Sequence, residues 1–181
     1  MSEPTVHLRP WSTADAPLLR GASTAPEVAR QLGGAPFADD AAAAAFIATR
    51  YRYDEHARNW AVVDATDTVV GSVSATAIED VHGTAWISYW LTPAARGRGL
   101  ATRAVVAAAD DAFALGLRRL ELGHRTNNPA SCRVATRAGF VVEGTERERL
   151  RYGDERFDVE THARLATDPV PDVEPLPRSR S

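Results

Sequence analysis

The sequence has a single cysteine, no long hydrophobic run and no excess of positive charge. The one cysteine, Cys132, excludes an intramolecular disulfide and fits a reducing cytoplasm. No apolar stretch approaches the roughly 18 residues that a membrane span needs. The formal net charge of −3 is unlike the basic footprint of nucleic-acid-binding proteins. These absences predict a cytoplasmic protein that binds neither membranes nor nucleic acid.

The composition is that of an ordinary globular protein. The chain has 181 residues, of which 44% are apolar and 25% charged, and both fractions are close to the averages for such proteins. This length suits one domain with a buried core. Beyond residue 166, prolines and charged residues replace apolar ones. We therefore expect one domain over residues 1–166 and a Pro-rich disordered tail over residues 167–181.

The spacing of apolar residues predicts an α+β fold. The expected order is a strand, two or three helices, a three-stranded meander, a helix, a strand, a helix and two strands. Helical spacing is clearest over residues 100–115, and alternation of apolar and polar residues is clearest over residues 72–77 and 157–165. Such an order builds a mixed sheet covered by helices.

A loop with two glycines and two arginines joins an expected strand to the longest expected helix. The sequence there, over residues 90–102, is WLTPAARGRGLAT. The start of a helix offers free N–H groups and a positive dipole end, which suit a phosphate. Gly97 and Gly99 let the backbone approach an anion, and Arg96 and Arg98 add positive charge. The alternative is a glycine-containing loop with solvated arginines, and the motif alone favours neither.

A second polar segment begins the next helix, where Asn128 and Ser131 lie three residues apart. By itself this spacing indicates helix capping. We interpret Cys132, the next residue, as a small helix-packing residue rather than a nucleophile. The histidines show no metal-ligand spacing along the chain, so no metal site is expected; they are His7, His56, His82, His124 and His162.

The two segments, in this order, resemble the GNAT family of N-acetyltransferases. Residues 96–101, RGRGLA, match that family's (Gln/Arg)-x-x-Gly-x-(Gly/Ala) signature, and NPAS at 128–131 followed by Gly139-Phe140 matches its second conserved segment. Residues 8–10, 60–63, 89–91 and 139–144 look like the branch that acetylates the N-termini of ribosomal proteins. The resemblance spans about residues 6–165.

The resemblance implies a fold and a reaction. The fold would be a mixed, mostly antiparallel sheet of six to seven strands, with helices on both faces and a V-shaped splay between the two central strands. The reaction would be direct attack of a primary amine, on a protein N-terminus or a small molecule, on the thioester of acetyl-CoA. Other acyl-CoA donors stay open. Members of the family occur as monomers and dimers, with a slight preference here for a homodimer.

The resemblance also implies roles for individual residues. Asn128 would hydrogen-bond the pantetheine or the incoming group, Ser131 would protonate the departing thiolate, and Tyr89 is grouped with them as catalytic. The strand end at residues 89–91 would lie along the pantetheine arm, with an N–H near Leu91 polarising the thioester carbonyl. Asn128 and Ser131 also belong to the predicted coenzyme-binding set, whose other members are Leu91, Arg96, Gly97, Arg98, Gly99, Leu100, Ala101 and Thr102.

One position departs from the family pattern. Many members of this branch carry a glutamate where this chain has Trp86, three residues before Tyr89. A protonated amine needs a base, and the candidates left open are Glu79, Asp80, His82 and Glu160. Trp86 also shares a strand face with Trp90, where both either line an acceptor pocket or pack in the core. The missing glutamate supports an alternative function, an acyl-CoA-binding regulatory or catalytically weak module.

Overall fold

The computed structural model describes residues 6–179 and shows one seven-stranded sheet with helices. The strands are β1 His7–Pro10, β2 Arg58–Val63, β3 Val69–Glu79, β4 Thr84–Leu91, β5 Arg119–Arg125, β6 Val141–Tyr152 and β7 Glu155–Leu165. The α-helices are α1 Ala16–Ala22, α2 Pro26–Gln31, α3 Asp40–Arg50, α4 Leu100–Ala114 and α5 Pro129–Arg137, and the short 3-10 helices are η1 Thr13–Asp15 and η2 Pro93–Ala95. The order of elements along the chain is the predicted one.

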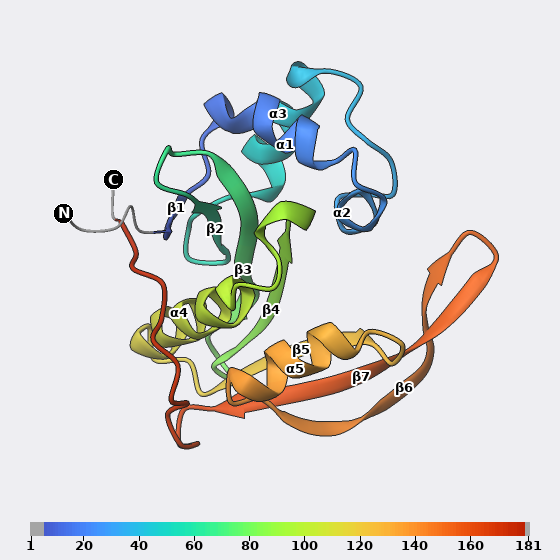
Figure 1. Ribbon diagram of the computed structural model, residues 1–181. Helices are drawn as coiled ribbons and strands as arrows, with labels where there is room; N and C mark the ends of the chain where they lie inside the picture. The colour runs from blue at the N-terminus through green and yellow to red at the C-terminus, as the bar shows by residue number, and fades with distance from the viewer. Residues whose placement is uncertain (1–5, 180–181) are drawn as a thin grey trace.

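The sheet is mostly antiparallel, with strand order β1-β2-β3-β4-β5-β7-β6. Only the central pair, β4 and β5, runs parallel. These two strands pair at three positions, where Thr84, Ala85 and Trp86 face residues 119–121. Beyond Trp86, β4 pairs only with β3, and β5 pairs only with β7. The sheet therefore opens into a V between β4 and β5 (Figure 1). The expected mixed sheet and its splay are confirmed.

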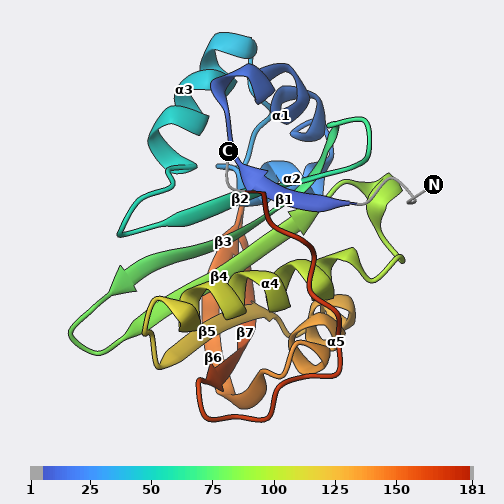
Figure 2. The same ribbon diagram turned by 90° about the vertical axis from the view of Figure 1, so that its left-hand side faces the viewer.

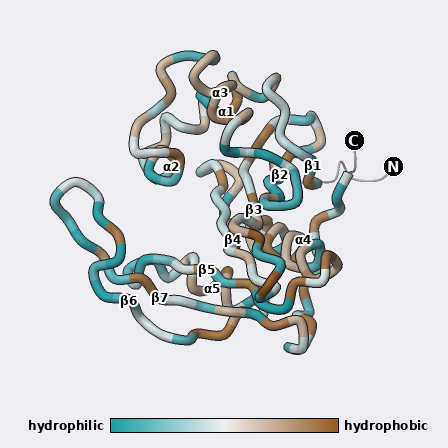
Figure 3. The backbone as a smooth tube through the Cα atoms, turned by 180° about the vertical axis from the view of Figure 1, so that it is seen from behind, coloured by the Kyte–Doolittle hydropathy of each residue, from teal (hydrophilic) through white to brown (hydrophobic). Residues whose placement is uncertain are grey.

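Hydrophobic cores lie on both faces of the sheet. On β2, Trp60 and Val62 belong to the core that α4 and α5 cover, whereas Ala61 and Val63 belong to the core under α1, α2 and α3. Alternate side chains of a strand point to opposite faces, so one strand feeds both cores. Figure 2 shows α4 and α1–α3 on opposite sides of β2–β4, as expected. Hydrophilic stretches lie at the surface, among them α2 and much of the β6–β7 hairpin (Figure 3).

The predicted disordered tail is wrong for residues 167–179. In Figures 1 and 2 residues 166–179, the C-terminal strap, cross α4 and reach β1. Leu176 is only 2% exposed within the α4 core. The amide of Leu8 donates to the carbonyl of Pro177 at 2.8 Å, and that of Ser179 donates to the carbonyl of Leu8 at 2.8 Å. Residues 180 and 181 lie outside the described residues.

Composition misled the prediction for a physical reason. Prolines prevent a helix or an inner strand, but an extended segment can still dock through a few anchors. Here the anchors are the buried Leu176 and an ion pair of 2.8 Å between Arg178 and Asp111 of α4. The expected boundary at residue 166 is therefore not a break in the structure.

Replacing Leu176 by alanine should destabilise the domain, because this side chain anchors the strap. Such large-to-small changes in a core cost about 2–5 kcal/mol, which lowers the Tm of a chain of this size by roughly 4–20 °C. Differential scanning calorimetry measures the shift. Val170→Ala, at a strap residue that is 82% exposed, should leave the Tm unchanged. An unchanged Tm for Leu176→Ala would show that the strap is not docked in solution.

Candidate functional site

A cleft of about 530 Å³ occupies the open end of the V, a size typical of small-molecule sites. It is lined by the end of β4, the loop before α4, one face of α5 and one face of α2. Arg98 is exposed and outside the lining. The other predicted site residues all line it: Tyr89, Leu91, Arg96, Gly97, Gly99, Leu100, Ala101, Thr102, Asn128 and Ser131. The fold thus brings the two sequence segments to one place.

The loop before α4 has the backbone shape that an anion site needs. Gly97 and Gly99 have φ angles of 76° and 74°, a region that residues with side chains rarely adopt. A Cβ placed on either glycine would meet nothing within 4 Å, so both face open space. Among the described residues, no side chain caps the start of α4. Its first amides are therefore available to a phosphate.

The side chain of Arg96 braces the loop. Its guanidinium donates to the carbonyl of Leu91 at 3.0 and 3.2 Å and forms an ion pair of 2.7 Å with Glu27 of α2. Arg96 therefore ties the loop to the end of β4 and to α2. Arg125, Arg133 and Arg137 add positive charge to the lining. We did not single out these three arginines from the sequence, although the last two share a helix face at i, i+4.

Asn128 orients Ser131 at the start of α5. The Oδ1 of Asn128 accepts from the Ser131 amide at 3.2 Å, and its Nδ2 donates to the Ser131 hydroxyl at 2.9 Å. The side chain of Asn128 thus caps the helix, as its spacing indicated. Because the Ser131 oxygen accepts this bond, its own proton remains free to be donated elsewhere.

Tyr89 reaches across the V from β4. Its hydroxyl lies 3.5 Å from the carbonyl oxygen of Ser131, to which it donates. Burial raises the pKa of Tyr89 above its ordinary value, so the phenol stays protonated at neutral pH. The hydroxyl of Tyr89 therefore meets the backbone of Ser131 where β4 faces α5.

Three of the four candidate bases lie far from the cleft. Glu79 ends β3, and Asp80 and His82 lie in the turn that follows, whose backbone donates two amide hydrogen bonds to the Glu79 carboxylate. That turn precedes β4, whereas the cleft lies at its other end. The five-residue distance from Thr84 to Tyr89 alone corresponds to about 17 Å of strand. The prediction that Glu79, Asp80 or His82 acts directly as the base is therefore wrong.

Only one carboxylate, Glu27, is found among the described residues that line the cleft. Hydrogen bonds from its own amide and from Arg96 lower the pKa of Glu27, which makes it a poor base. The fourth candidate, Glu160, does not line the cleft; its carboxylate contacts His162 and His124. The lining therefore offers proton donors but no free carboxylate.

The two tryptophans of β4 share one face of the strand and differ in environment. Trp90 packs in the core under α1–α3, and its indole N–H donates to the Tyr51 hydroxyl at 2.9 Å. Core packing therefore explains Trp90, which also lines the cleft. Trp86 is 38% exposed and covers Gly123 of β5, where a Cβ would lie 3.2 Å from its ring.

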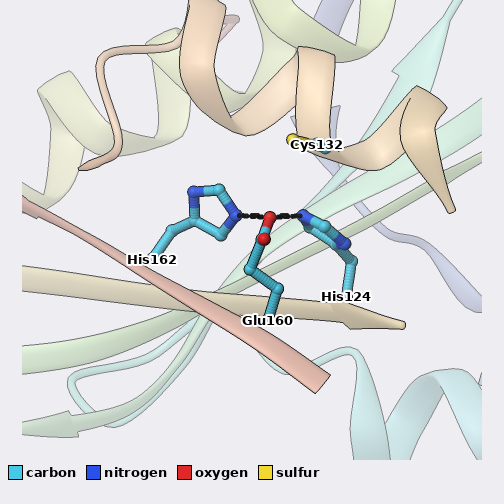
Figure 4. Close-up of side chains that lie close together, drawn as sticks. All are labelled: His124, Cys132, Glu160 and His162. Carbon is cyan, nitrogen blue, oxygen red and sulfur yellow. Dashed lines mark hydrogen bonds and ion pairs between the residues drawn. The ribbon is translucent and has the colours of Figure 1, made fainter. Parts of the chain in front are cut away.

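The sequence analysis missed a cluster beside this site. His124 of β5, Cys132 of α5, and Glu160 and His162 of β7 bring their ligand atoms within 4.8 Å of one another (Figure 4). The histidines are 38 residues apart in the sequence, so no local spacing reveals them. The β5–β7 register, which places His124 opposite Glu160, assembles the cluster.

The sheet opens into a V, with a glycine loop at the start of α4 on one arm and the capped helix α5 on the other. This arrangement defines the class of acetyl-CoA-dependent acyltransferases. The chain belongs to the GNAT acetyltransferase family, because the model of the acetyltransferase (GNAT) domain matches residues 5–141. Acetyl-CoA is the donor that this family uses.

Relatives agree with this assignment. The ribosomal-protein-serine acetyltransferase of Escherichia coli is 35% identical over 100 residues, which are 55% of this chain and 56% of that protein. The chain thus matches about half the length of this relative. Similar solved structures include a spermidine N-acetyltransferase from Vibrio cholerae in complex with coenzyme A and spermine (TM-score 0.79, 21% identity, 91% and 97% of the two chains covered). Another is RimL, a ribosomal alpha-N-protein acetyltransferase in complex with coenzyme A (TM-score 0.77, 22% identity, 89% and 94% covered).

None of the helices in residues 6–179 is long and apolar enough to cross a membrane.

Replacing Gly99 by valine should abolish coenzyme A binding while the domain stays folded. A branched side chain at a φ of 74° strains the loop and fills the space in front of the α4 amides. Calorimetric titration with coenzyme A measures the affinity, and circular dichroism checks the fold. Gly153→Val puts the same side chain at a φ of 60° in the distant β6–β7 turn and should keep wild-type affinity. Unchanged affinity in Gly99→Val would disprove the loop as the phosphate site.

Proposed function

We propose that this protein is an N-acetyltransferase that transfers the acetyl group of acetyl-CoA to a primary amine. The favoured acceptor is the α-amino group of a peptide or protein. The observation that carries the proposal is the single cleft at the splay of β4 and β5, which the glycine loop and the start of α5 both line. Other acyl-CoA donors fit the same loop.

The cleft suits an extended donor. The pyrophosphate would bind the amides at the start of α4, with the arginines of the lining adding positive charge. The pantetheine arm would follow the unpaired edge of β4 from Leu91 towards Tyr89. The thioester would then lie near Tyr89 and Ser131, where an N–H near Leu91 polarises its carbonyl.

The chemistry is a direct transfer. The neutral amine nitrogen attacks the thioester carbon, the new C–N bond forms, and the C–S bond breaks as the tetrahedral intermediate collapses. The departing thiolate takes a proton from Ser131, whose hydroxyl proton Asn128 leaves free. Tyr89, kept protonated by burial, becomes a second donor when its long bond to the Ser131 carbonyl is exchanged for one to the thiolate. The attacking nitrogen loses its proton to solvent, and Ser131 regains a proton from solvent, which restores its hydroxyl.

The scarcity of carboxylates in the lining supports an acceptor that is already partly neutral. At pH 7 about one tenth of an α-amine with a pKa near 8 is neutral, against fewer than about one in a thousand for an aliphatic amine with a pKa near 10.4. A polycationic acceptor would also meet three arginines in the lining that it would repel, Arg125, Arg133 and Arg137. The similarity to a ribosomal-protein-serine acetyltransferase points the same way.

The second candidate function is an acyl-CoA-binding module with weak or no turnover. Trp86, at the position where the resemblance to the ribosomal-protein branch implies a glutamate, favours it. Coenzyme A binding without acetylation of any amine would select this alternative. A cytoplasmic location stays a prediction. So does the choice between monomer and homodimer, where the exposed Val141 and Val142 on edge strand β6 favour the dimer.

Ser131→Ala should lower kcat by about 10²-fold, as expected for the loss of a general acid. Affinity for coenzyme A should change less, because the loop before α4 remains intact. Steady-state kinetics and calorimetric titration separate the two effects. Thr136→Ala removes a hydroxyl from the exposed side of the same helix and should leave kcat unchanged. Wild-type kcat in Ser131→Ala would remove Ser131 from the mechanism.

A peptide with a free N-terminal serine should be acetylated at pH 7 with a kcat/KM at least about tenfold above that of spermidine, because more of its amine is neutral. The kcat/KM for the peptide should rise with pH and level off above about pH 8, where the α-amine is mostly neutral. Thiol release measures both rates. An N-acetylated peptide with an internal lysine is the control and should react slowly. Faster turnover of spermidine would contradict the peptide acceptor.

A further inference from the structure

We propose that His124, Glu160, His162 and Cys132, the His–Glu–Cys cluster, form a binding site for a divalent transition-metal ion of the zinc type. None of the four side chains lines the cleft, so this site is distinct from the proposed acetyl-CoA site. Figure 4 shows the two imidazoles and the carboxylate converging on one point below the start of α5, with Cys132 above them.

The distances fit a single ion. The two Nε2 atoms are 2.9 Å apart, and the Oε1 of Glu160 lies 3.0 Å from His162 Nε2 and 3.4 Å from His124 Nε2. Ligands of a tetrahedral zinc ion, bound at 2.0–2.1 Å, are roughly 3.3 Å apart. The Cys132 sulfur is within 4.8 Å of the other three atoms, and rotation about its side-chain bond would bring it closer as the fourth ligand.

Proton accounting also favours a cation. The Nδ1 of His124 lies 3.0 Å from the carbonyl oxygen of Arg125, which only accepts, so Nδ1 carries the proton and Nε2 presents a lone pair. Glu160 presents only lone pairs when ionised. Without a metal ion, one N–H on His162 Nε2 would have to donate to both His124 Nε2 and the Glu160 carboxylate. Those two acceptor atoms would still be in contact with each other. A metal ion at the centre satisfies all three atoms at once.

The surroundings are those of a built site. The side chains of His124 and His162 are 6% and 0% exposed, and that of Glu160 is 27% exposed, which leaves an entry path for an ion. The bond from His124 Nδ1 to a backbone carbonyl fixes the ring orientation, as in known metal sites. A carboxylate and a thiolate would offset the two positive charges of the ion, so the buried site is neutral overall.

The position of the cluster gives the ion a positioning role. Its ligands come from β5, from β7 and from the first turn of α5, where Cys132 directly follows Ser131. An ion there would join the start of α5 to one arm of the V. It would thereby hold Asn128 and Ser131 at the cleft without touching the substrates.

The test is metal binding by the intact protein without coenzyme A or an amine. Protein stripped with a chelator should take up one zinc ion per chain by elemental analysis, and zinc should raise its Tm. Titration with cobalt should give the visible absorption of a tetrahedral site. It should also give a thiolate-to-cobalt band that Cys132→Ala removes.

Variants locate the ion. Glu160→Gln and His124→Ala should weaken zinc affinity by on the order of 100-fold or more, since even loss of an outer partner of a ligand costs 10–100-fold. Glu146→Gln and His56→Ala, at exposed positions, should bind as the wild type does. Zinc and cobalt binding by the stripped wild-type protein tests the proposal even if a variant does not fold.

Failure of the stripped protein to bind zinc or cobalt would overturn the proposal and leave a histidine pair that shares a proton. Wild-type affinity in both Glu160→Gln and His124→Ala would overturn it as well. Neither result would count against the N-acetyltransferase proposal, because the metal is measured in the absence of both substrates.

Discussion

The brevity of the β4–β5 ladder is the constraint on which the rest of the structure depends. Three paired positions hold the two halves of the sheet together, and beyond Trp86 the strands separate. Strand edges that do not pair with each other keep polar backbone groups free, so the gap suits a ligand of peptide-like shape. The loop before α4 continues one arm and α5 follows the other, which is why both segments meet in one cleft.

The contents of the cleft set its chemistry. Hydroxyls of Tyr89 and Ser131 can supply a proton to a leaving group, while the carboxylate of Glu27 is held by Arg96. Such a site assists departure of the thiolate more than it assists deprotonation of the amine. The reaction would then depend on an acceptor that arrives neutral, and the protonation state of the amine becomes part of substrate selection.

Two tertiary arrangements support the arms of the V. The C-terminal strap fastens α4 to β1 through Leu176 and Arg178. The His–Glu–Cys cluster lies between α5 and the β5–β7 pair, beyond the positions at which β5 pairs with β4. Both arrangements are made mostly of residues outside the motifs by which the family is recognised, and both contact elements that line the cleft.

The sequence by itself determined the order of elements, the α+β class and the loop at Arg96–Thr102, because these follow from periodicity, glycine and capping over short distances. It could not place Glu79 far from the cleft, since that depends on which end of β4 opens. Nor could it reveal the histidine cluster, which strand register assembles from residues 38 apart. Composition predicted that the strap is disordered, yet Leu176 of the strap is buried in the core. Local free energies act within a few residues of the chain, whereas pairing register and burial are decided only when distant elements pack together.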